Sequence, residues 1–240
     1  MESTQTKEYI NAPMELYQGF LESPEKRNNC LNDVLRYEIG KTLIQEPCYT
    51  LMDALHSLGR VYSGHEPDEY AEECKSFFHQ HQGERKVYFS ISIDQFDRFY
   101  DEDEDETDEE RTLFIAYLAL KSIIGDKPFY KTNKYLWLAR MDCKSKSVQS
   151  IDDLSEQVRR YATTYQQRRM RELLESYYNV LFWSKSLNGC KGGLKGFYFT
   201  LTLDPNEFMS ALLKTRDKQK RCSRAIEFER AMQAALKMTT

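Results

Sequence analysis

The chain has 240 residues, of which 40% are hydrophobic and 30% are charged. This apolar content is enough to form a core, so it excludes a wholly disordered chain. The longest apolar run, residues 113–120, is far shorter than the roughly 20 residues that a membrane helix needs, so we expect no membrane partner. Because the polar N-terminus, residues 1–9, lacks an apolar signal region, we also expect a cytoplasmic protein.

The net charge of −4 hides a strong asymmetry between the two halves of the chain. Residues 1–110 hold 10 Lys and Arg against 26 Asp and Glu, a net charge of −16. Residues 111–240 hold 24 Lys and Arg against 12 Asp and Glu, a net charge of +12. Such a split indicates either different partners for the two halves or attraction between them, and the two interpretations are compatible.

Residues 1–85 are predicted to form an all-helical module with no evident chemistry. Ser23 and Pro24 give the clearest helix start, with Ser as the cap and Pro at the first helical position. The apolar residues that follow recur every three or four positions, which places them on one helical face. Other helices are predicted to start at Pro13 and Pro67 and to run from Thr50 to Tyr62.

Residues 86–93 alternate apolar and less apolar side chains, which predicts a strand, and residues 94–100 are predicted to form a helical turn. Residues 101–110 then hold nine acidic residues in ten positions. This run has three interpretations: a solvated loop that leads into the N-terminal dipole of a helix, a calcium loop, or an intramolecular decoy that covers the basic half. A calcium loop is disfavoured because Glu106 occupies the position where an EF-hand needs Gly.

The second half is predicted to contain helices over residues 111–124, 133–141, 151–162 and 164–178, with a polar loop over 126–132. Gly125 is suited to end the first helix, and Asn133 is suited to cap the second. The apolar positions before and after Thr163 do not share one stripe, so the stretch divides into two helices there. A hairpin with a Gly-rich, cationic tip follows over residues 180–203, and Pro205 starts a last helix.

This order of helices and hairpin is typical of a winged-helix unit, in which one helix enters the major groove of DNA and the hairpin tip approaches phosphates. We therefore predict a mainly α (α+β) protein in three parts. These are a helical module over residues 1–85, a winged-helix domain with a small antiparallel sheet over 86–205, and a basic C-terminal helix over 206–240. The strand over residues 86–93 is expected to join the hairpin.

The predicted helix over residues 164–178 is the candidate DNA-reading element. Its buried side is expected to hold Met170, Leu173, Leu174 and Tyr177, and its exposed side Gln167, Arg168, Arg169 and Arg171. Gln can pair with adenine and Arg with guanine, and each cation can also neutralise a phosphate of double-stranded DNA. The candidate DNA-contacting residues are Lys131, Lys134, Arg159, Arg160, Gln167, Arg168, Arg169, Arg171, Lys185, Lys191 and Lys195.

An alternative function needs no nucleic acid. Exposed arginines are common on helices, and Glu172 and Glu175 lie at spacings of three and four residues from arginines, where they can form ion pairs. Winged-helix folds also serve as protein-interaction modules, because a fold does not determine its function. The alternative hypothesis is an adaptor or scaffold whose basic face binds an acidic protein partner, including its own first half.

Several short motifs resemble an uncharacterised bacterial family that is found near mobile elements. The motifs are YINAP at residues 9–13, ALKSIIG at 119–125, KTNK at 131–134, LARM at 138–141, RRY at 159–161 and GFYF at 196–199. More distantly, the second half resembles the winged-helix domains of plasmid replication initiators. The resemblance implies a DNA-binding regulator or replication-associated factor of a mobile element.

Motifs of common enzymes are missing from the sequence. The chain has no G-x-x-x-x-G-K-[ST], G-x-G-x-x-G, G-x-S-x-G or H-E-x-x-H pattern. The six cysteines include no C-x-x-C pair, the usual spacing of structural zinc sites, and Cys74 with His79 and His81 lacks a fourth ligand nearby. We therefore expect no enzymatic activity, no cofactor and no metal, and reduced cysteines that serve mainly in packing.

Overall fold

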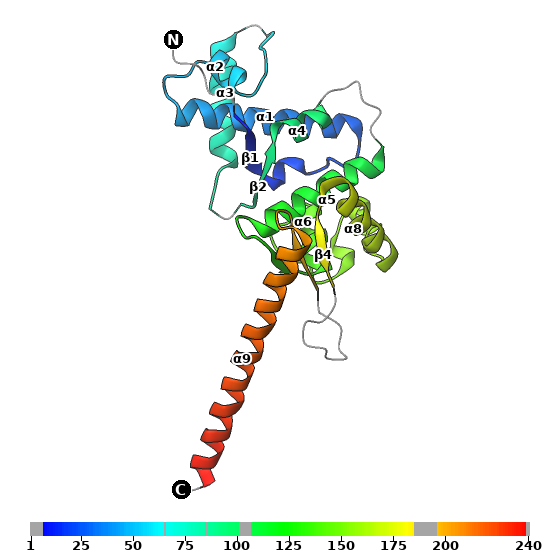
Figure 1. The fold of residues 1–240 in the computed structure, drawn as a ribbon. Helices are drawn as coiled ribbons and strands as arrows, with labels where there is room; N and C mark the ends of the chain where they lie inside the picture. The colour runs from blue at the N-terminus through cyan, green and yellow to red at the C-terminus, as the bar shows by residue number, and fades with distance from the viewer. Residues whose placement is uncertain (1–6, 65, 85, 101–106, 185–195, 239–240) are drawn as a thin grey trace.

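A computed structural model describes residues 7–64, 66–84, 86–100, 107–184 and 196–238. Within these residues the protein is mainly helical, as predicted, and contains two small antiparallel sheets, where one had been predicted. Figure 1 shows the first half of the chain at one end of the molecule and the second half next to it. A long C-terminal helix projects away from both halves.

The first half combines helices with a two-stranded sheet. Its elements are β1 (Tyr9–Pro13), the 3-10 helix η1 (Met14–Tyr17), α1 (Pro24–Gln45), α2 (Leu51–Ser57), α3 (Pro67–His81), β2 (Tyr88–Ser92) and α4 (Ile93–Tyr100). The helix starts at Pro24 and Pro67 are confirmed, and α4 confirms the predicted helical turn. Pro13 instead precedes a 3-10 helix, and α2 is shorter than the predicted helix.

Strand β1 corrects two predictions. It pairs antiparallel with β2, with Ile10 opposite Ile91, so residues 1–85 are not all helical and residues 86–93 do not join the hairpin. Ile10 and Ala12 are buried whereas Tyr9 and Asn11 are exposed, which is the alternation of a strand. The sequence could not show this pairing because the two strands lie far apart along the chain.

A buried carboxylate ties β1 to α1. Glu38 has no exposed surface and accepts a hydrogen bond from the backbone N–H of Asn11 at 2.7 Å. Its two oxygens also pair with the ammonium groups of Lys7 at 3.1 Å and Lys41 at 2.9 Å. A buried charge is tolerated only when it is paired and hydrogen-bonded, so these three contacts let Glu38 anchor the strand.

Helices α1 and α3 cross closely at Gly40. A Cβ atom at this position would lie 2.0 Å from the carbonyl oxygen of Cys74. Because interiors are close-packed, any side chain at Gly40 would force the two helices apart. The rings of Tyr37 and Phe78 contact each other in the same helix pair, with centroids 5.1 Å apart.

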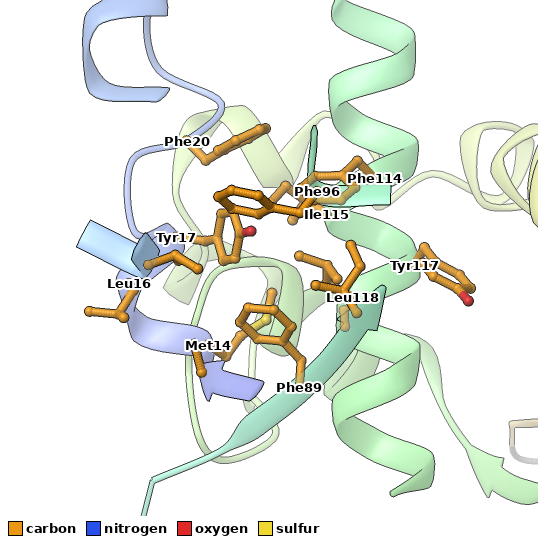
Figure 2. Close-up of a cluster of buried hydrophobic side chains, with 14 of the residues drawn as sticks. Met14, Leu16, Tyr17, Phe20, Phe89, Phe96, Phe114, Ile115, Tyr117 and Leu118 are labelled. Carbon is orange, nitrogen blue, oxygen red and sulfur yellow. The ribbon is translucent and has the colours of Figure 1, made fainter. Parts of the chain in front are cut away.

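Aromatic side chains from both halves of the chain meet in one core (Figure 2). The ring centroid of Tyr17 lies 5.2 Å from that of Phe89 and 5.8 Å from that of Phe114. Phe114 belongs to α5 (Asp108–Ile124), and its ring stacks on Phe99 with centroids 4.0 Å apart. The first half therefore packs against helix α5, which belongs to the second half. This packing joins the two halves in one core.

The second half surrounds a three-stranded sheet. After α5 its elements are β3 (Tyr130–Thr132), α6 (Lys134–Met141), the 3-10 helix η2 (Ile151–Asp153), α7 (Glu156–Arg159), α8 (Thr164–Tyr178), β4 (Leu181–Trp183) and β5 (Phe197–Thr200). The strands lie in the order β3-β5-β4, and both pairs are antiparallel. The hairpin strands are confirmed. The third strand, β3, lies in the segment 126–132 that was predicted to be a loop. It was not recognised as a strand because three residues are too few to display an alternating pattern.

The predicted helix over residues 151–162 is interrupted between η2 and α7. Leu154 and Ser155 separate the two short elements. The backbone N–H of Ser155 donates a hydrogen bond to Asp142 at 3.1 Å, and its hydroxyl donates to the same carboxylate. This contact comes from a distant part of the chain, so the local sequence pattern could not predict the break.

Helix α9 (Pro205–Met238) begins on the outer face of the three-stranded sheet and then leaves the body of the protein (Figure 1). Phe208 and Leu212 are buried against Tyr198 in a small cluster that is separate from the main core. The predicted start at Pro205 is confirmed. Among the described residues, no helix is both long enough and apolar enough to span a membrane.

Candidate nucleic-acid interface

Helix α8 presents its first two turns to solvent. The hydroxyl of Thr163 caps the helix by accepting a backbone hydrogen bond at 3.2 Å. Met170 and Leu174 are buried and hold the helix against the core. On the other side, Tyr165 is 70% exposed and the side chain of Arg168 is 79% exposed. The start of α8 therefore offers an aromatic ring and a guanidinium to a partner.

Gln167 does not belong to the exposed face of α8, so its predicted exposure is wrong. Its side chain is buried, and Nε2 donates a hydrogen bond to the carbonyl oxygen of Tyr161 at 3.0 Å. Gln167 lies three residues before Met170, so both side chains lie on the same face of the helix. Tyr177, which was predicted to be buried, is 57% exposed.

The neighbouring residues Arg168 and Arg169 have different partners. The Nε atom of Arg168 donates a hydrogen bond to Glu172 at 2.8 Å, one turn along the exposed face of α8. A guanidinium nitrogen of Arg169 instead pairs with Glu109 in the first turn of α5, at 2.5 Å. Exposed pairs within one helix contribute little stability, so Arg168 can exchange its partner at low cost. Arg169 connects two helices.

Glu109 belongs to the acidic run that precedes and begins α5. Thr107 caps this helix, and Glu110 returns a hydrogen bond to the backbone N–H of Thr107 at 3.0 Å. The end of the run therefore lies at the N-terminal dipole of a helix, in agreement with the first interpretation of the sequence. Residues 101–106, on which the decoy hypothesis mainly depends, lie outside the described residues.

An open hollow of about 580 Å³ lies where the starts of α6 and α8 meet the base of the β4–β5 hairpin. Lys134, Thr164, Arg171 and Ser184 line it. Asn133 caps α6 through Oδ1, which accepts backbone hydrogen bonds at 2.9 and 3.0 Å. The N-terminal end of a helix carries the positive end of the helix dipole, which favours an anion nearby. The hollow therefore combines two helix N-termini with two cations.

Arg171 is a half-buried cation of this hollow. Its guanidinium carbon lies 5.4 Å from the ring centroid of Phe197, and Nε donates a hydrogen bond to the carbonyl oxygen of Gln167 at 3.1 Å. Burial lowers the pKa of Arg171, but the group stays charged at neutral pH. At the edge of the hollow, Gly196 lets the start of β5 approach the end of β3, because a Cβ there would lie 2.1 Å from the carbonyl oxygen of Thr132.

Arg159 and Arg160 do not line the hollow. One guanidinium nitrogen of Arg159 donates hydrogen bonds to the carbonyl oxygens of Asp152 and Leu154, at 3.0 and 2.9 Å. Arg159 therefore stabilises the turn between η2 and α7. The guanidinium carbon of Arg160 lies 5.1 Å from the ring centroid of Tyr161.

The predicted lysines fall into three groups. Lys134 lines the hollow, whereas Lys131 is exposed on β3. Lys131 pairs in register with Tyr198, and its ammonium lies 5.8 Å from that ring, so it belongs to the outer face of the sheet. The hairpin lysines Lys185, Lys191 and Lys195 lie outside the described residues.

The cysteines of the described residues have no disulfide partner. Cys30 and Cys74 are buried, and burial raises their pKa values to about 12 and about 11. Both thiols are therefore neutral at physiological pH and act as packing groups. In the part of the chain that the structure describes, no group of three or more His, Cys, Asp or Glu is placed to hold a metal ion.

The structure thus brings together only part of the predicted set. Lys134, Gln167 and Arg171 line the hollow, and Arg168 lies one turn before Arg171 on α8. Sequence reasoning missed Tyr165 and Thr164, although their position in the first turn of the candidate helix was a usable signal.

Comparisons with protein-family models, with curated proteins and with solved structures found no match to this chain. The resemblance to a family near mobile elements therefore stays a prediction. Support for a function comes from the geometry of the site.

Proposed function

We propose that residues 107–200 form a winged-helix unit that binds duplex DNA through the start of α8 and the adjacent hollow. The order α5, β3, α6, α8, β4, β5 with the sheet order β3-β5-β4 supports this proposal, because it is typical of winged-helix proteins. In the related helix-turn-helix proteins, the N-terminal residues of the second helix contact base edges in the major groove. Helix α8 has this position.

The observation that carries the proposal is the chemistry of the hollow. Lys134, Arg171 and the N-termini of α6 and α8 all favour an anion at one place. Phosphate contacts of this kind set the position of a protein on DNA without reading its sequence. A backbone phosphate beside Lys134 would place the first turns of α8 next to the groove.

Sequence reading is assigned to the exposed face of α8. Arg168 can give up Glu172 and pair with the O6 and N7 atoms of guanine, which is the most common specific contact in the major groove. Tyr165 lies three residues before Arg168, so the two side chains are neighbours on the helix surface. Its ring can contact the sugar–phosphate backbone or a thymine methyl group.

A binding experiment with the double variant Arg168→Ala/Lys134→Gln tests this proposal. Fluorescence anisotropy would measure affinity for a mixed-sequence duplex of about two helical turns, near 20 base pairs. We expect the parent protein to bind at low salt, with an affinity that falls steeply as salt rises. The double variant is expected to bind at least about tenfold more weakly, because it loses one base contact and one phosphate contact.

The matched control is Lys75→Gln/Arg98→Ala, which removes the same charge from the first half. Lys75 pairs with Glu72 and Arg98 pairs with Glu110, away from the hollow. The control should bind DNA as the parent does. If the parent has no measurable affinity for duplex DNA at about 50 mM salt, the proposal is wrong.

The adaptor function remains the competing proposal because of two further features of α8. Glu172 and Glu175 lie on its exposed surface among the arginines, and Tyr177 adds an exposed aromatic ring near its end. Mixed charges with an aromatic anchor suit a protein partner. A protein partner that binds at low and high salt alike, and whose binding Tyr177→Ala abolishes, would favour the adaptor.

A role in a mobile element depends on both DNA binding and the sequence resemblance. If DNA binding is found, a regulator or replication-associated factor is the proposed class. Selection of bound sequences from a random duplex pool would test it, because a regulator requires a preferred site that competes against non-specific DNA.

A further inference from the structure

Among its described side chains, the long helix α9 is anchored at its start. Phe208 and Leu212 are buried against the outer face of the sheet, and the ring of Phe129 lies 6.3 Å from that of Phe208. Met209 and Leu213 are already partly exposed. Beyond this anchor the helix extends away from the rest of the protein (Figure 1).

The segment that follows the anchor is strongly basic. Residues 214–221 contain five Lys and Arg, one Asp and no apolar residue. Arg216 pairs with the adjacent Asp217 at 3.1 Å. The other cations have no carboxylate within 4.0 Å among the described side chains, and all are exposed: Lys214, Lys218, Lys220, Arg221 and Arg224.

The spacing of these cations arranges them in two stripes along the helix. Lys214, Lys218 and Arg221 follow one another at intervals of four and three residues, so they share one face. At 100° per residue this face points away from the side that holds Phe208 and Leu212. The three charges span about 10 Å of helix. Arg216, Lys220 and Arg224 form the second stripe.

Lys131 belongs to the same side of the molecule as the start of α9. Its side chain and that of Tyr198 share the outer face of the sheet, and Tyr198 packs against Phe208. Lys131 was predicted to contact DNA together with residues that line the hollow. The sheet instead separates Lys131 from the inner face, where Phe182 and Phe197 contact the core.

We propose that residues 214–224 of α9, together with Lys131, form a second DNA-contacting surface that binds the phosphate backbone of a duplex. This inference rests on the proposed DNA-binding function. It assigns a partner to a segment that belongs neither to α8 nor to the hollow. A run of unpaired cations on an exposed helix attracts phosphates regardless of base sequence. The surface therefore supplies affinity and salt dependence, and α8 supplies sequence preference.

The composition of the segment favours nucleic acid over a protein partner. Cores of protein–protein interfaces are rich in aromatic residues, Met and Arg, and they are depleted in Lys. Residues 214–221 offer no apolar anchor, and three of their five cations are Lys. Charge alone is the recognition chemistry of a polyphosphate backbone.

The test is a salt series on the full chain with the triple variant Lys214→Gln/Lys218→Gln/Arg221→Gln. The logarithm of the duplex binding constant would be plotted against the logarithm of the salt concentration. Each lost phosphate contact lowers the slope by about 0.9, so we expect a slope shallower by about 2 to 3 and binding at least about tenfold weaker at low salt. Base preference should not change, because phosphate contacts carry no sequence information.

Two further variants keep the result free of folding effects. Lys214→Arg/Lys218→Arg/Arg221→Lys retains all three charges and should bind as the parent does. Asp217→Asn removes the single acid of the segment and releases Arg216 from its ion pair, so it should bind more tightly with a steeper slope. Circular dichroism would confirm that helix content is equal in all variants.

The outcomes separate this inference from the proposed function. If Arg168→Ala weakens DNA binding but the triple variant keeps the parent slope, α9 is not a DNA-contacting surface and the proposed function stands. If the parent binds no duplex at low salt, both proposals are wrong. If the triple variant binds duplex like the parent but no longer binds polyglutamate, the segment recognises acidic protein and the inference is overturned.

Discussion

The buried carboxylate Glu38 and the basic segment of α9 show that the two halves use charge in opposite ways. Glu38 has no exposed surface and is held by Lys7, Lys41 and a backbone N–H. Apart from Arg216, which pairs with Asp217, the cations of residues 214–224 are exposed and have no carboxylate partner among the described side chains. Charge in the first half therefore includes a structural anchor. The basic segment of α9 leaves its charge exposed, although the chain as a whole is nearly neutral.

The largest expected effect tests the structural side of this comparison. Glu38→Ala would leave two lysines and a backbone N–H without their buried acceptor, so we expect a loss of about 3 to 5 kcal/mol of folding free energy. Urea denaturation would measure it. A loss below about 1 kcal/mol, the range of an exposed ion pair, would contradict the assignment of Glu38 as the anchor of β1.

The next effect tests the binding side. Arg168→Ala removes an exposed guanidinium whose described hydrogen-bond partner is Glu172 in the same helix. We therefore expect almost no change in stability, but a loss of about 1 to 3 kcal/mol in binding to a preferred duplex. Thermal unfolding would measure the change in stability, and fluorescence anisotropy on the same samples would measure the change in duplex affinity. A variant that loses stability and keeps its affinity would reverse the assignment.

Arg169 provides a contrast on the same helix. It pairs with Glu109 across to α5, and both side chains are about half exposed. We expect Arg169→Ala and Glu109→Gln each to reduce stability by about 0.2 to 1 kcal/mol. A double-mutant cycle would measure the coupling. DNA affinity should fall less for Arg169→Ala than for Arg168→Ala, and equal losses would show that Arg169 also contacts DNA.

The smallest effect concerns pH. Burial raises the pKa of Glu15, but hydrogen bonds from Lys86 at 2.5 Å and His81 at 2.9 Å outweigh burial and hold this pKa below the ordinary value of 4.5. A carboxyl whose pKa is lowered by folding stabilises the protein above its unfolded pKa and loses this contribution as pH falls through the folded value. Glu15→Gln should therefore be less stable than the parent at neutral pH, by less than about 1 kcal/mol because the site is partly exposed.

Acid titration of unfolding would check the prediction for Glu15. The difference in free energy of unfolding between the parent and Glu15→Gln should shrink as pH falls below 4.5. Titration of Glu15 should not change this difference between pH 6 and 8. A difference that persists under acidic conditions would show that Glu15 acts through packing rather than charge.

Local signals in the sequence predicted the helices well. Ser23 and Asn133 each cap a helix and Gly125 ends one, as predicted, because these residues act within their own turn. Strands β1 and β3 were missed as such, since a short strand is defined by a partner elsewhere in the chain. Pairing of this kind is not visible in a local pattern.

The candidate site could be predicted only in part. Helical spacing correctly placed Arg168 on the outer face of α8, and the cap at Asn133 placed Lys134 at a helix start. The prediction from helical spacing that Gln167 is exposed was wrong. A polar side chain can be buried when it finds a hydrogen-bond acceptor, which here is the carbonyl oxygen of Tyr161. Lys131 lies on the outer face of the sheet and does not line the hollow, because strand pairing decides which face of a sheet a residue occupies.

An NMR titration of the full chain with a short duplex tests the central claim most directly. The account predicts that the amide signals of residues 133–136 and 163–168 shift first, because these residues form the two helix N-termini at the hollow. Shifts that are confined to α1 and α3, or no shifts at low salt, would contradict a DNA-binding surface at the start of α8.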